Sequence, residues 1–325
     1  MGFYKFISRL SILPAIIGWR APVLLDPNPL STADVCEKVL PSVFRILGND
    51  SNSTIALGSG FFIRADGTGL TAAHVVSKGL SYRAKLDSGQ EYPMKVLQSH
   101  PLSDIALIKV QAPTPVPYLP LADSSKARRG EQIIHYGNTI FGNSTEIDIG
   151  YINKLYDDTP KWVEIQMSEN IESFKSGIQY IITSGSVRPG FSGGPLVNMK
   201  GEVVGLIARL YIRGQGPSME HEGASIPSNV VKGVVKQMEL SGKVQRPYIG
   251  LSFVNNDPGL VVVKIQSGSP AEKAGLKVGD VVLTANGRNV NSNEDILTVI
   301  GYNIGIILDL KINREGSLMN IKVYT

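Results

Sequence analysis

Short apolar runs, separated by turn-forming residues, fill the chain from about residue 43 to residue 224. Ser59–Ile63, Ala106–Val110 and Glu202–Ala208 are examples, and Asp66-Gly67 marks one of the turns between them. Many strands at close spacing indicate an all-β sandwich or barrel. The only cysteine is Cys36, so no intramolecular disulfide can form and the strands must be held by a hydrophobic core.

A helical pattern comes next in the chain. Val230, Val231, Val234, Val235 and Met238 recur at helical spacing. They predict a helix over residues 228–241, with Ser228 as its cap and Gly242 as its stop, that closes a first domain.

Residues 247–325 form a second predicted unit after a short linker. Strands are expected at Leu260–Ile265 and Val281–Ala285, with two more near the C-terminus, and helices at Ser269–Ala274 and Ser292–Ile300. The chain therefore divides into an N-terminal segment, 1–34, a first domain, 35–242, and a second domain, 247–325.

Segment 1–34 carries Lys5 and Arg9 ahead of an uncharged stretch, and no acid occurs before Asp26. The stretch is too short to span a bilayer as a helix. It fits the centre of an export signal, and also a mitochondrial presequence or an interfacial membrane anchor. We expect export to the periplasm or cell envelope, with the mitochondrion as the alternative.

The net charge of +4 is small, and the Lys and Arg residues are scattered along the chain. This pattern predicts no nucleic-acid partner. No metal-ligand spacing and no phosphate-binding loop occurs in the sequence, so neither a metal nor a cofactor is expected.

Three segments carry the residue types that acyl transfer needs. Leu70–Val76 contains His74, Ser103–Ile108 contains Asp104, and Pro189–Leu196 contains a serine among glycines. A serine hydroxyl needs a base to take its proton, and histidine suits that task. A carboxylate then holds the imidazole in the right tautomer.

We predict that Ser192 is the nucleophile, His74 the base and then the acid, and Asp104 the residue that orients His74. The backbone N–H groups of Gly190 and Ser192 are predicted to form the oxyanion hole. Each segment alone is typical of a turn or a cap, but the order His, Asp, Ser in a strand-rich chain favours catalysis. The remaining histidines lack the small-residue context of His74 and are expected to be structural or surface residues: His100, His135 and His221.

Thr71–Val76, Ser103–Leu107 and Gly190–Pro195 resemble the three motifs of the HtrA/DegP family, and Gly268–Val282 resembles the core of its PDZ domain. The resemblance spans residues 38–325. It implies a mainly β fold, with a trypsin-like double six-stranded β-barrel followed by a small α+β PDZ domain. It also implies ATP-independent cleavage of unfolded or damaged proteins, and a homotrimer.

The serine segment departs from the family pattern. Phe191 stands where many members carry Asn, and Ser186-Val187-Arg188 replaces Ala-Ile-Asn. These changes leave the predicted triad intact, but they leave open the resting arrangement of the loop and whether Arg188 reaches the specificity pocket.

The resemblance places the specificity pocket between Val187 and the strand residues Ile207 and Ala208. Because these are aliphatic and no carboxylate joins them, cleavage after small or medium aliphatic residues is expected.

The resemblance also places a carboxylate-binding loop at Tyr248–Leu251, where hydrophobic C-terminal peptides are expected to bind. Gly250 would let the backbone approach the ligand, and Ile249 and Leu251 would offer apolar walls. On the following helix, Ile296 and Ile300 either complete the groove or belong to the domain core.

Two other functions compete with an active endopeptidase. A peptide-binding or chaperone protein could use the same scaffold with the active site inactive at rest. A lipase or esterase is disfavoured, because those enzymes carry a Gly-x-Ser-x-Gly elbow and place the histidine last in the chain.

Overall fold

The structure is a computed structural model. It describes residues 30–49, 53–140, 142, 144–157, 178, 180–185, 187–213, 220–245, 247–256, 258–303 and 305–325. The predicted segment 1–34 therefore lies almost wholly outside the described residues. Within the described part, no helix has both the length and the apolar character needed to span a bilayer.

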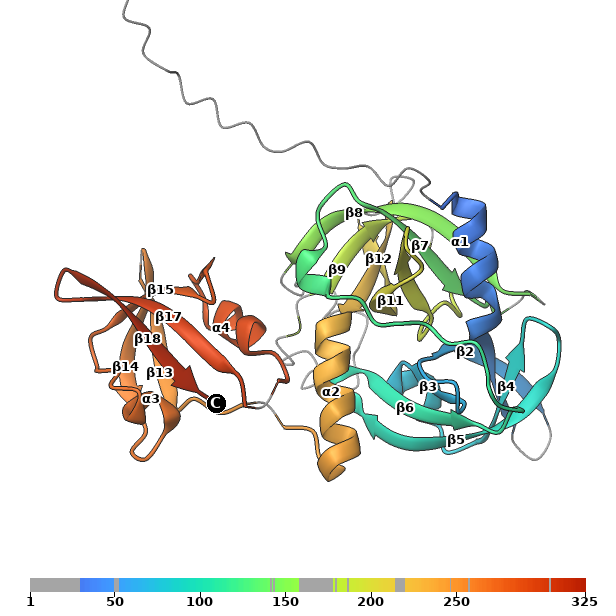
Figure 1. Cartoon of the computed structure of the whole chain (residues 1–325), viewed down its shortest axis with the longest axis horizontal. Helices are drawn as coiled ribbons and strands as arrows, with labels where there is room; N and C mark the ends of the chain where they lie inside the picture. Colours follow the sequence, from blue (N-terminus) through green and yellow to red (C-terminus); the bar gives the residue numbers. More distant parts are fainter. Residues whose placement is uncertain are drawn as a thin grey trace, which may run out of the picture.

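A closed barrel with strand order β1-β2-β3-β6-β5-β4 forms the first part of the fold (Figure 1). Its strands are β1 (Val43–Asn49), β2 (Thr54–Phe62), β3 (Thr68–Thr71), β4 (Ser81–Leu86), β5 (Glu91–His100) and β6 (Ile105–Val110). Helix α1 (Thr32–Val39) precedes it and buries Val35 and Val39 in the same core as Phe44 and Phe62.

A second closed barrel has strand order β10-β11-β12-β9-β8-β7. Its strands are β7 (Gln132–Gly137), β8 (Glu146–Asp157), β9 (Tyr180–Ser184), β10 (Pro195–Asn198), β11 (Val203–Arg213) and β12 (Glu220–Pro227). The strand pattern of the sequence left a sandwich or a barrel open; the paired barrels confirm the double six-stranded architecture that the resemblance implied.

Helix α2 (Ser228–Ser241) has the predicted extent and ends at Gly242, whose φ is +65°. The predicted cap is wrong: Pro227 is the N-cap, and the Ser228 hydroxyl instead donates to the Ala122 carbonyl at 2.7 Å. The prediction failed because the tertiary partner competes for the hydroxyl. The helix contacts strands of both barrels, β6 and β11.

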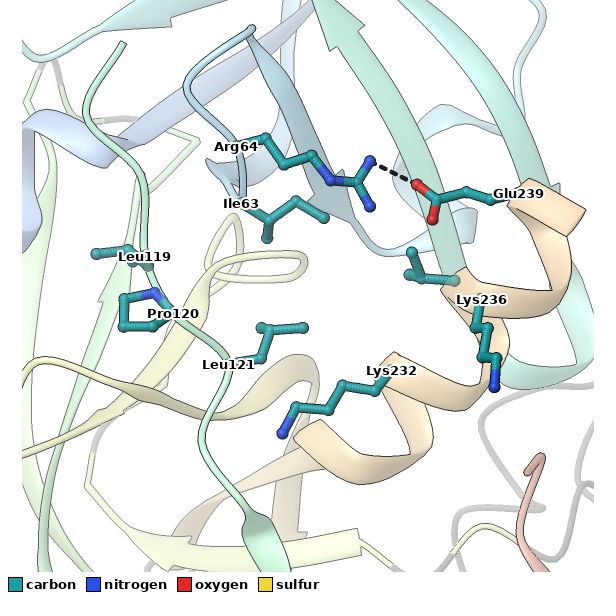
Figure 2. A pocket seen from close by; sticks show the side chains of 9 residues that line it. Ile63, Arg64, Leu119, Pro120, Leu121, Lys232, Lys236 and Glu239 are labelled. Atoms are coloured by element: carbon teal, nitrogen blue, oxygen red, sulfur yellow. Dashed lines mark ion pairs between the residues drawn. The ribbon is translucent and has the colours of Figure 1, made fainter. Parts of the chain in front are cut away.

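Two tethers flank a pocket of about 250 Å³ beside α2. Glu239 pairs with Arg64 at 2.5 Å, and Lys232 donates to the Ala122 carbonyl at 2.7 Å. Figure 2 shows the apolar side chains of Ile63 and Leu121 between them. These contacts fix α2 to the rest of the first domain.

The C-terminal domain is a sheet of β13 (Leu251–Asn256), β14 (Gly259–Ile265), β15 (Val281–Ala285), β17 (Ile307–Arg314) and β18 (Ser317–Tyr324), with β16 (Arg288–Asn289) paired to β15. Helices α3 (Pro270–Lys273) and α4 (Asn293–Ile300) complete it. Each begins at a serine N-cap, Ser269 and Ser292, close to where the sequence predicts. The domain has a separate apolar core.

Candidate active site

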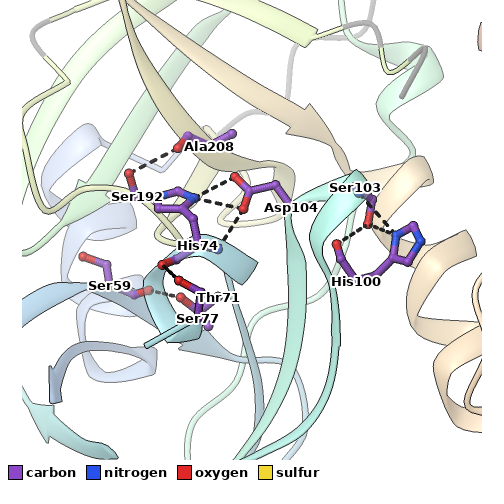
Figure 3. A network of polar contacts seen from close by, with 9 residues as sticks. All are labelled: Ser59, Thr71, His74, Ser77, His100, Ser103, Asp104, Ser192 and Ala208. Carbon is purple, nitrogen blue, oxygen red and sulfur yellow. Dashed lines mark hydrogen bonds and ion pairs between the residues drawn. The ribbon is translucent and has the colours of Figure 1, made fainter. Parts of the chain in front are cut away.

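His74 and Asp104 lie together at the edge of the first barrel (Figure 3). His74 sits in the short helix η2 (Ala73–Val76), which follows β3, and Asp104 directly precedes β6. The His74 Nδ1 atom is 2.9 Å from Oδ1 and 2.8 Å from Oδ2 of Asp104. An ionised carboxylate only accepts hydrogen bonds, so Nδ1 carries the proton and Nε2 is left as the basic nitrogen.

Backbone contacts lock this pair in place. The His74 backbone N–H donates to Asp104 Oδ1 at 3.0 Å, and the Ala73 N–H donates to the Asp104 carbonyl at 3.1 Å. Asp104 is only 8% exposed and has a left-handed conformation, with φ of 54°. A non-glycine residue persists in that conformation only when its surroundings impose it.

Ser192 lies on the loop that enters β10, and this loop comes close to the segment of His74, because a Cβ on Gly193 would lie 2.8 Å from the Ala72 backbone nitrogen. Figure 3 draws Ser192 and His74 in the same part of the site. Its Oγ donates to the Ala208 carbonyl at 3.2 Å. A hydroxyl has one proton, so in this arrangement Ser192 does not donate to His74. The three predicted triad residues are thus brought together, with the nucleophile turned toward β11.

The glycines around Ser192 are needed for the shape of the loop. Gly190 and Gly193 have φ of +103° and +85°. A Cβ on Gly190 would lie 2.2 Å from the Asn138 carbonyl oxygen, and one on Gly193 would lie 2.3 Å from the Ser59 carbonyl oxygen. No other residue fits either position without moving the backbone.

Ser59, on β2 of the first barrel, holds this loop from across the barrel interface. Its backbone N–H donates to the Ser192 carbonyl at 2.9 Å, and its hydroxyl donates to the Gly190 carbonyl at 2.7 Å. The same hydroxyl accepts from the Asn138 N–H at 2.7 Å. Sequence reasoning missed Ser59, because a lone serine in a strand has no motif around it.

The carbonyl of Pro189 accepts from the Ile140 N–H at 3.3 Å. In a trans peptide the N–H points opposite to the carbonyl, so the Gly190 N–H is directed away from Ile140.

Arg45, from the first barrel, supports this region by donating to the Thr139 carbonyl at 3.1 Å. Burial lowers the pKa of Arg45, and the nearby carboxylate of Glu146 opposes that shift.

The two unusual residues of the loop, Arg188 and Phe191, both contact the second barrel. Arg188 pairs with Glu146 on β8, and Glu146 also accepts from Thr139 Oγ1 at 2.6 Å. Phe191 is 1% exposed and packs in the core of the second barrel against Gly137. Both side chains therefore anchor the loop to the second barrel.

The predicted pocket residues are closed in by their neighbours. Val187 is 3% exposed, and Ile207 and Ala208 are fully buried. A Cβ on Gly223 would lie 2.7 Å from Val187 Cγ2, so the Val187 side chain packs against strand β12.

The predicted PDZ residues lie mostly in the domain core. Ile249, Ile296 and Ile300 are buried there, and Leu251 packs partly against them. For the two helix residues, the structure thus favours the core interpretation. Gly250 has φ of +78°, and a Cβ on it would lie 2.2 Å from Ser269 Cβ. Gly250 therefore lets its own backbone pack closely against Ser269, the N-cap of α3.

Comparison with known proteins agrees with these observations. Residues 58–206 match the trypsin-like peptidase domain, and residues 247–325 match the PDZ domain. The chain is 32% identical over 281 residues to a probable periplasmic serine endoprotease DegP-like from Marinomonas sp. (strain MWYL1), covering 82% of this chain. It is 31% identical over 312 residues to a protein of the same description from Ectopseudomonas mendocina (strain ymp), covering 92% of this chain. This chain belongs to the HtrA/DegP family.

The chain spans 56% and 62% of the lengths of these two relatives. Among solved structures, it resembles the HtrA-type protease AlgW with tripeptide, at a TM-score of 0.65 and 22% identity. That match covers 91% of this chain and 96% of the other. AlgW with decapeptide gives a TM-score of 0.63 at 21% identity, covering 91% and 98%. At these identities the likeness supports the HtrA-type fold.

Proposed function

We propose that this HtrA/DegP chain is a serine endopeptidase that cleaves unfolded or damaged polypeptides without ATP, in protein quality control. The observation that carries the proposal is the meeting of His74, Asp104 and Ser192 from three distant segments of sequence. A residue set with only a structural role would not need an imidazole fixed in one tautomer together with a serine on a tight glycine loop.

The arrangement supports an acyl-transfer mechanism. After the Ser192 hydroxyl turns from Ala208 to His74, Oγ attacks the scissile carbonyl and its proton passes to Nε2. Asp104 stabilises the imidazolium that forms, and the N–H groups of Gly190 and Ser192 donate to the oxyanion. His74 then protonates the leaving amine. A water next attacks the acyl carbonyl and gives its proton to His74, which returns it to Ser192 Oγ as the acyl group leaves.

Digestion of casein by the whole chain tests this assignment. Ser192→Ala and His74→Ala should each lower the rate by about 10⁴–10⁶-fold, and the double variant should lose little more, because the residues act as a unit. Losses that multiply in the double variant would contradict a joint role. Mapping of the cut sites tests the pocket: we expect cleavage after Val, Ala or Leu, and a dominant preference for Lys or Arg would contradict the assignment of Val187, Ile207 and Ala208.

One observation favours a second candidate function. Because the Ser192 hydroxyl is engaged by Ala208, the chain can also be described as a peptide-binding or chaperone protein whose site is inactive at rest. A fluorophosphonate probe separates the two. Labelling that is lost in Ser192→Ala supports the enzyme, and no labelling with or without added peptides supports the binding protein.

We further propose that hydrophobic C-terminal peptides bind the PDZ domain at Ile249–Leu251. Substitution at Gly250 is a poor test, since any side chain there collides with Ser269. Leu251→Asp is better, because it places a charge beside the expected ligand carboxylate. Leu318→Asp, at a residue of the same domain that is 60% exposed, is the matched control. Peptide binding measured by fluorescence anisotropy should be lost only in Leu251→Asp, and equal binding by both would place the ligand elsewhere.

An exported, periplasmic location is supported by the names of the two relatives, both described as periplasmic. The homotrimer and a membrane association through residues 1–34 rest on the family resemblance and on the sequence of that segment. Light scattering of the purified chain tests the trimer, and fractionation of cells that express the whole chain tests the location and the anchor.

A further inference from the structure

Tyr302 belongs to the C-terminal domain but is buried against the protease domain. It lies two residues after the end of α4 and is 3% exposed, within the apolar cluster that contains Val234 and Met238 of α2. The Tyr302 carbonyl accepts from Gln237 Nε2 at 2.5 Å. A Cβ on Gly233 would lie 3.1 Å from that same carbonyl oxygen, so a glycine on α2 lets Tyr302 come close.

The Tyr302 ring meets His100, the last residue of β5. Their ring centroids are 5.8 Å apart with an interplanar angle of 78°, an edge-to-face contact. This is a contact between the PDZ domain and the barrel that carries the base. Glu239 of α2 pairs with Arg64 of the first barrel, and Lys232 of α2 donates to the Ala122 carbonyl, so Tyr302 packs on a helix that is bonded to the barrel carrying His100.

His100 in turn holds the turn that presents Asp104. Its Nδ1 accepts from the Ser103 backbone N–H at 3.2 Å and is 2.8 Å from Ser103 Oγ, which makes His100 the N-cap of η3 (Pro101–Ser103). Asp104 is the C-cap of the same short helix, and its N–H donates to the Pro101 carbonyl at 3.1 Å. Figure 3 shows His100 and Ser103 to the right of Asp104, on the side away from His74.

Asp104 needs such support, because its left-handed conformation is disfavoured for a residue with a Cβ. Loss of the cap would let η3 relax and the carboxylate turn away from His74. We propose that His100 is a positioning residue for Asp104, and that Tyr302 of the PDZ domain holds His100 in that role. The inference deepens the proposed function and rests on the place of Asp104 in the triad.

Two substitutions at His100 separate its two contacts in the full-length chain. His100→Asn keeps a side-chain acceptor suited to an N-cap but removes the ring, whereas His100→Phe keeps a ring but removes the acceptor. With a short unstructured peptide as substrate, we expect kcat to fall by about five- to tenfold in His100→Phe and by only about threefold in His100→Asn, which keeps the cap but loses the contact with Tyr302. KM should stay unchanged in both variants, because the side chain at position 100 does not contact substrate. Rates are divided by the folded fraction measured by circular dichroism.

Tyr302 gives a second, independent pair of variants. Tyr302→Ala removes the ring and should lower kcat by about threefold, whereas Tyr302→Phe keeps the ring and should retain most of the rate. In the His100→Phe background, where the cap is already lost, Tyr302→Ala should have no further effect on kcat.

The inference is overturned if His100→Asn loses as much activity as His100→Phe, or if Tyr302→Ala leaves kcat unchanged. It is also overturned if the effect of Tyr302→Ala is the same with and without the cap. If His100→Phe does not fold, the two Tyr302 variants still decide the question. Asp104→Asn, measured in parallel, separates a failure of the inference about His100 from a failure of the proposed function. If Asp104→Asn is active, Asp104 is not part of the triad. If it is inactive, only the role of His100 is in question.

Discussion

The two barrels contribute to the active site in different ways. The first barrel supplies His74 and Asp104, which are joined by two ring contacts and a backbone hydrogen bond that lie within that barrel. The second barrel supplies Ser192 on a loop whose carbonyls, at Gly190 and Ser192, are held by Ser59 of the other barrel. The base is therefore preassembled, whereas the nucleophile and the oxyanion hole depend on the interface.

This difference indicates where activity is controlled. Within the first barrel, His74 already has the tautomer that catalysis needs, because Nδ1–H donates to the Asp104 carboxylate and Nε2 is left as the basic nitrogen. In the second, the Ser192 hydroxyl must leave Ala208 before it can react. The loop is bonded to Ser59 across the barrel interface, whereas the His74–Asp104 pair is bonded within one barrel.

Asp104→Asn should have the largest effect and acts only on the preassembled half. In the native protein the His74 backbone N–H donates to Asp104 Oδ1, and the closer carboxylate oxygen to His74 Nδ1 is Oδ2, at 2.8 Å. An asparagine whose oxygen serves the backbone N–H would present its amide group to Nδ1. This forces the proton onto Nε2 and removes the base, so we expect kcat to fall by about 10⁴-fold. Circular dichroism should show an unchanged fold, and a fall of less than about tenfold would contradict the assigned role.

The chemistry-bearing residues could be found in the sequence because each carries its context with it. His74 follows small residues at a strand end, and Ser192 sits among glycines whose positive φ the structure then requires. Helix α2 was predictable for a similar reason, since its apolar spacing is local. Local signals of this kind fix what a residue is suited to do and which element holds it.

Contacts between distant segments left no such signal. Nothing in the sequence marks Ser59 as a partner of Gly190, 131 positions away. The inward direction of Phe191 and the pairing of Arg188 with Glu146 depend on the packing of the second barrel, as does the burial of Val187. Ser228 was predicted as a cap because serine is a common N-cap residue, and the prediction failed because its hydroxyl binds Ala122 on another segment. The parts that could not be predicted are therefore those that decide the resting state of the loop.

Ser59→Ala should have a smaller effect and acts on the dependent half. The substitution removes one hydroxyl that is fully buried, and it leaves the Gly190 carbonyl and the Asn138 N–H without their partner. A buried polar group left unpaired costs about 1–3 kcal/mol, so we expect kcat to fall by about 10–100-fold as the loop loses its arrangement. Ser77→Ala is the matched control: its hydroxyl donates to the His74 carbonyl at an exposed position, and its loss should change kcat by less than about twofold. Equal rates for the two variants would show that the interface does not hold the loop.

Arg188→Gln should have the smallest effect and tests whether the loop is also held from within its own barrel. The Arg188 side chain is 56% exposed, and exposed ion pairs contribute about 0–1 kcal/mol, so kcat should fall by no more than about fivefold. Because salt screens such pairs, the difference from the native enzyme should shrink as the salt concentration rises toward about 1 M. Arg128→Gln removes another exposed pair of the same barrel, with Glu131, far along the chain from the loop, and should leave kcat unchanged. The contrary outcome is a loss in kcat for Arg188→Gln that equals the loss in Ser59→Ala and does not change with salt concentration. In that case the second barrel holds the nucleophile loop as firmly as the interface does. The contrast between the two halves of the site would then be weaker than the hydrogen bonds indicate.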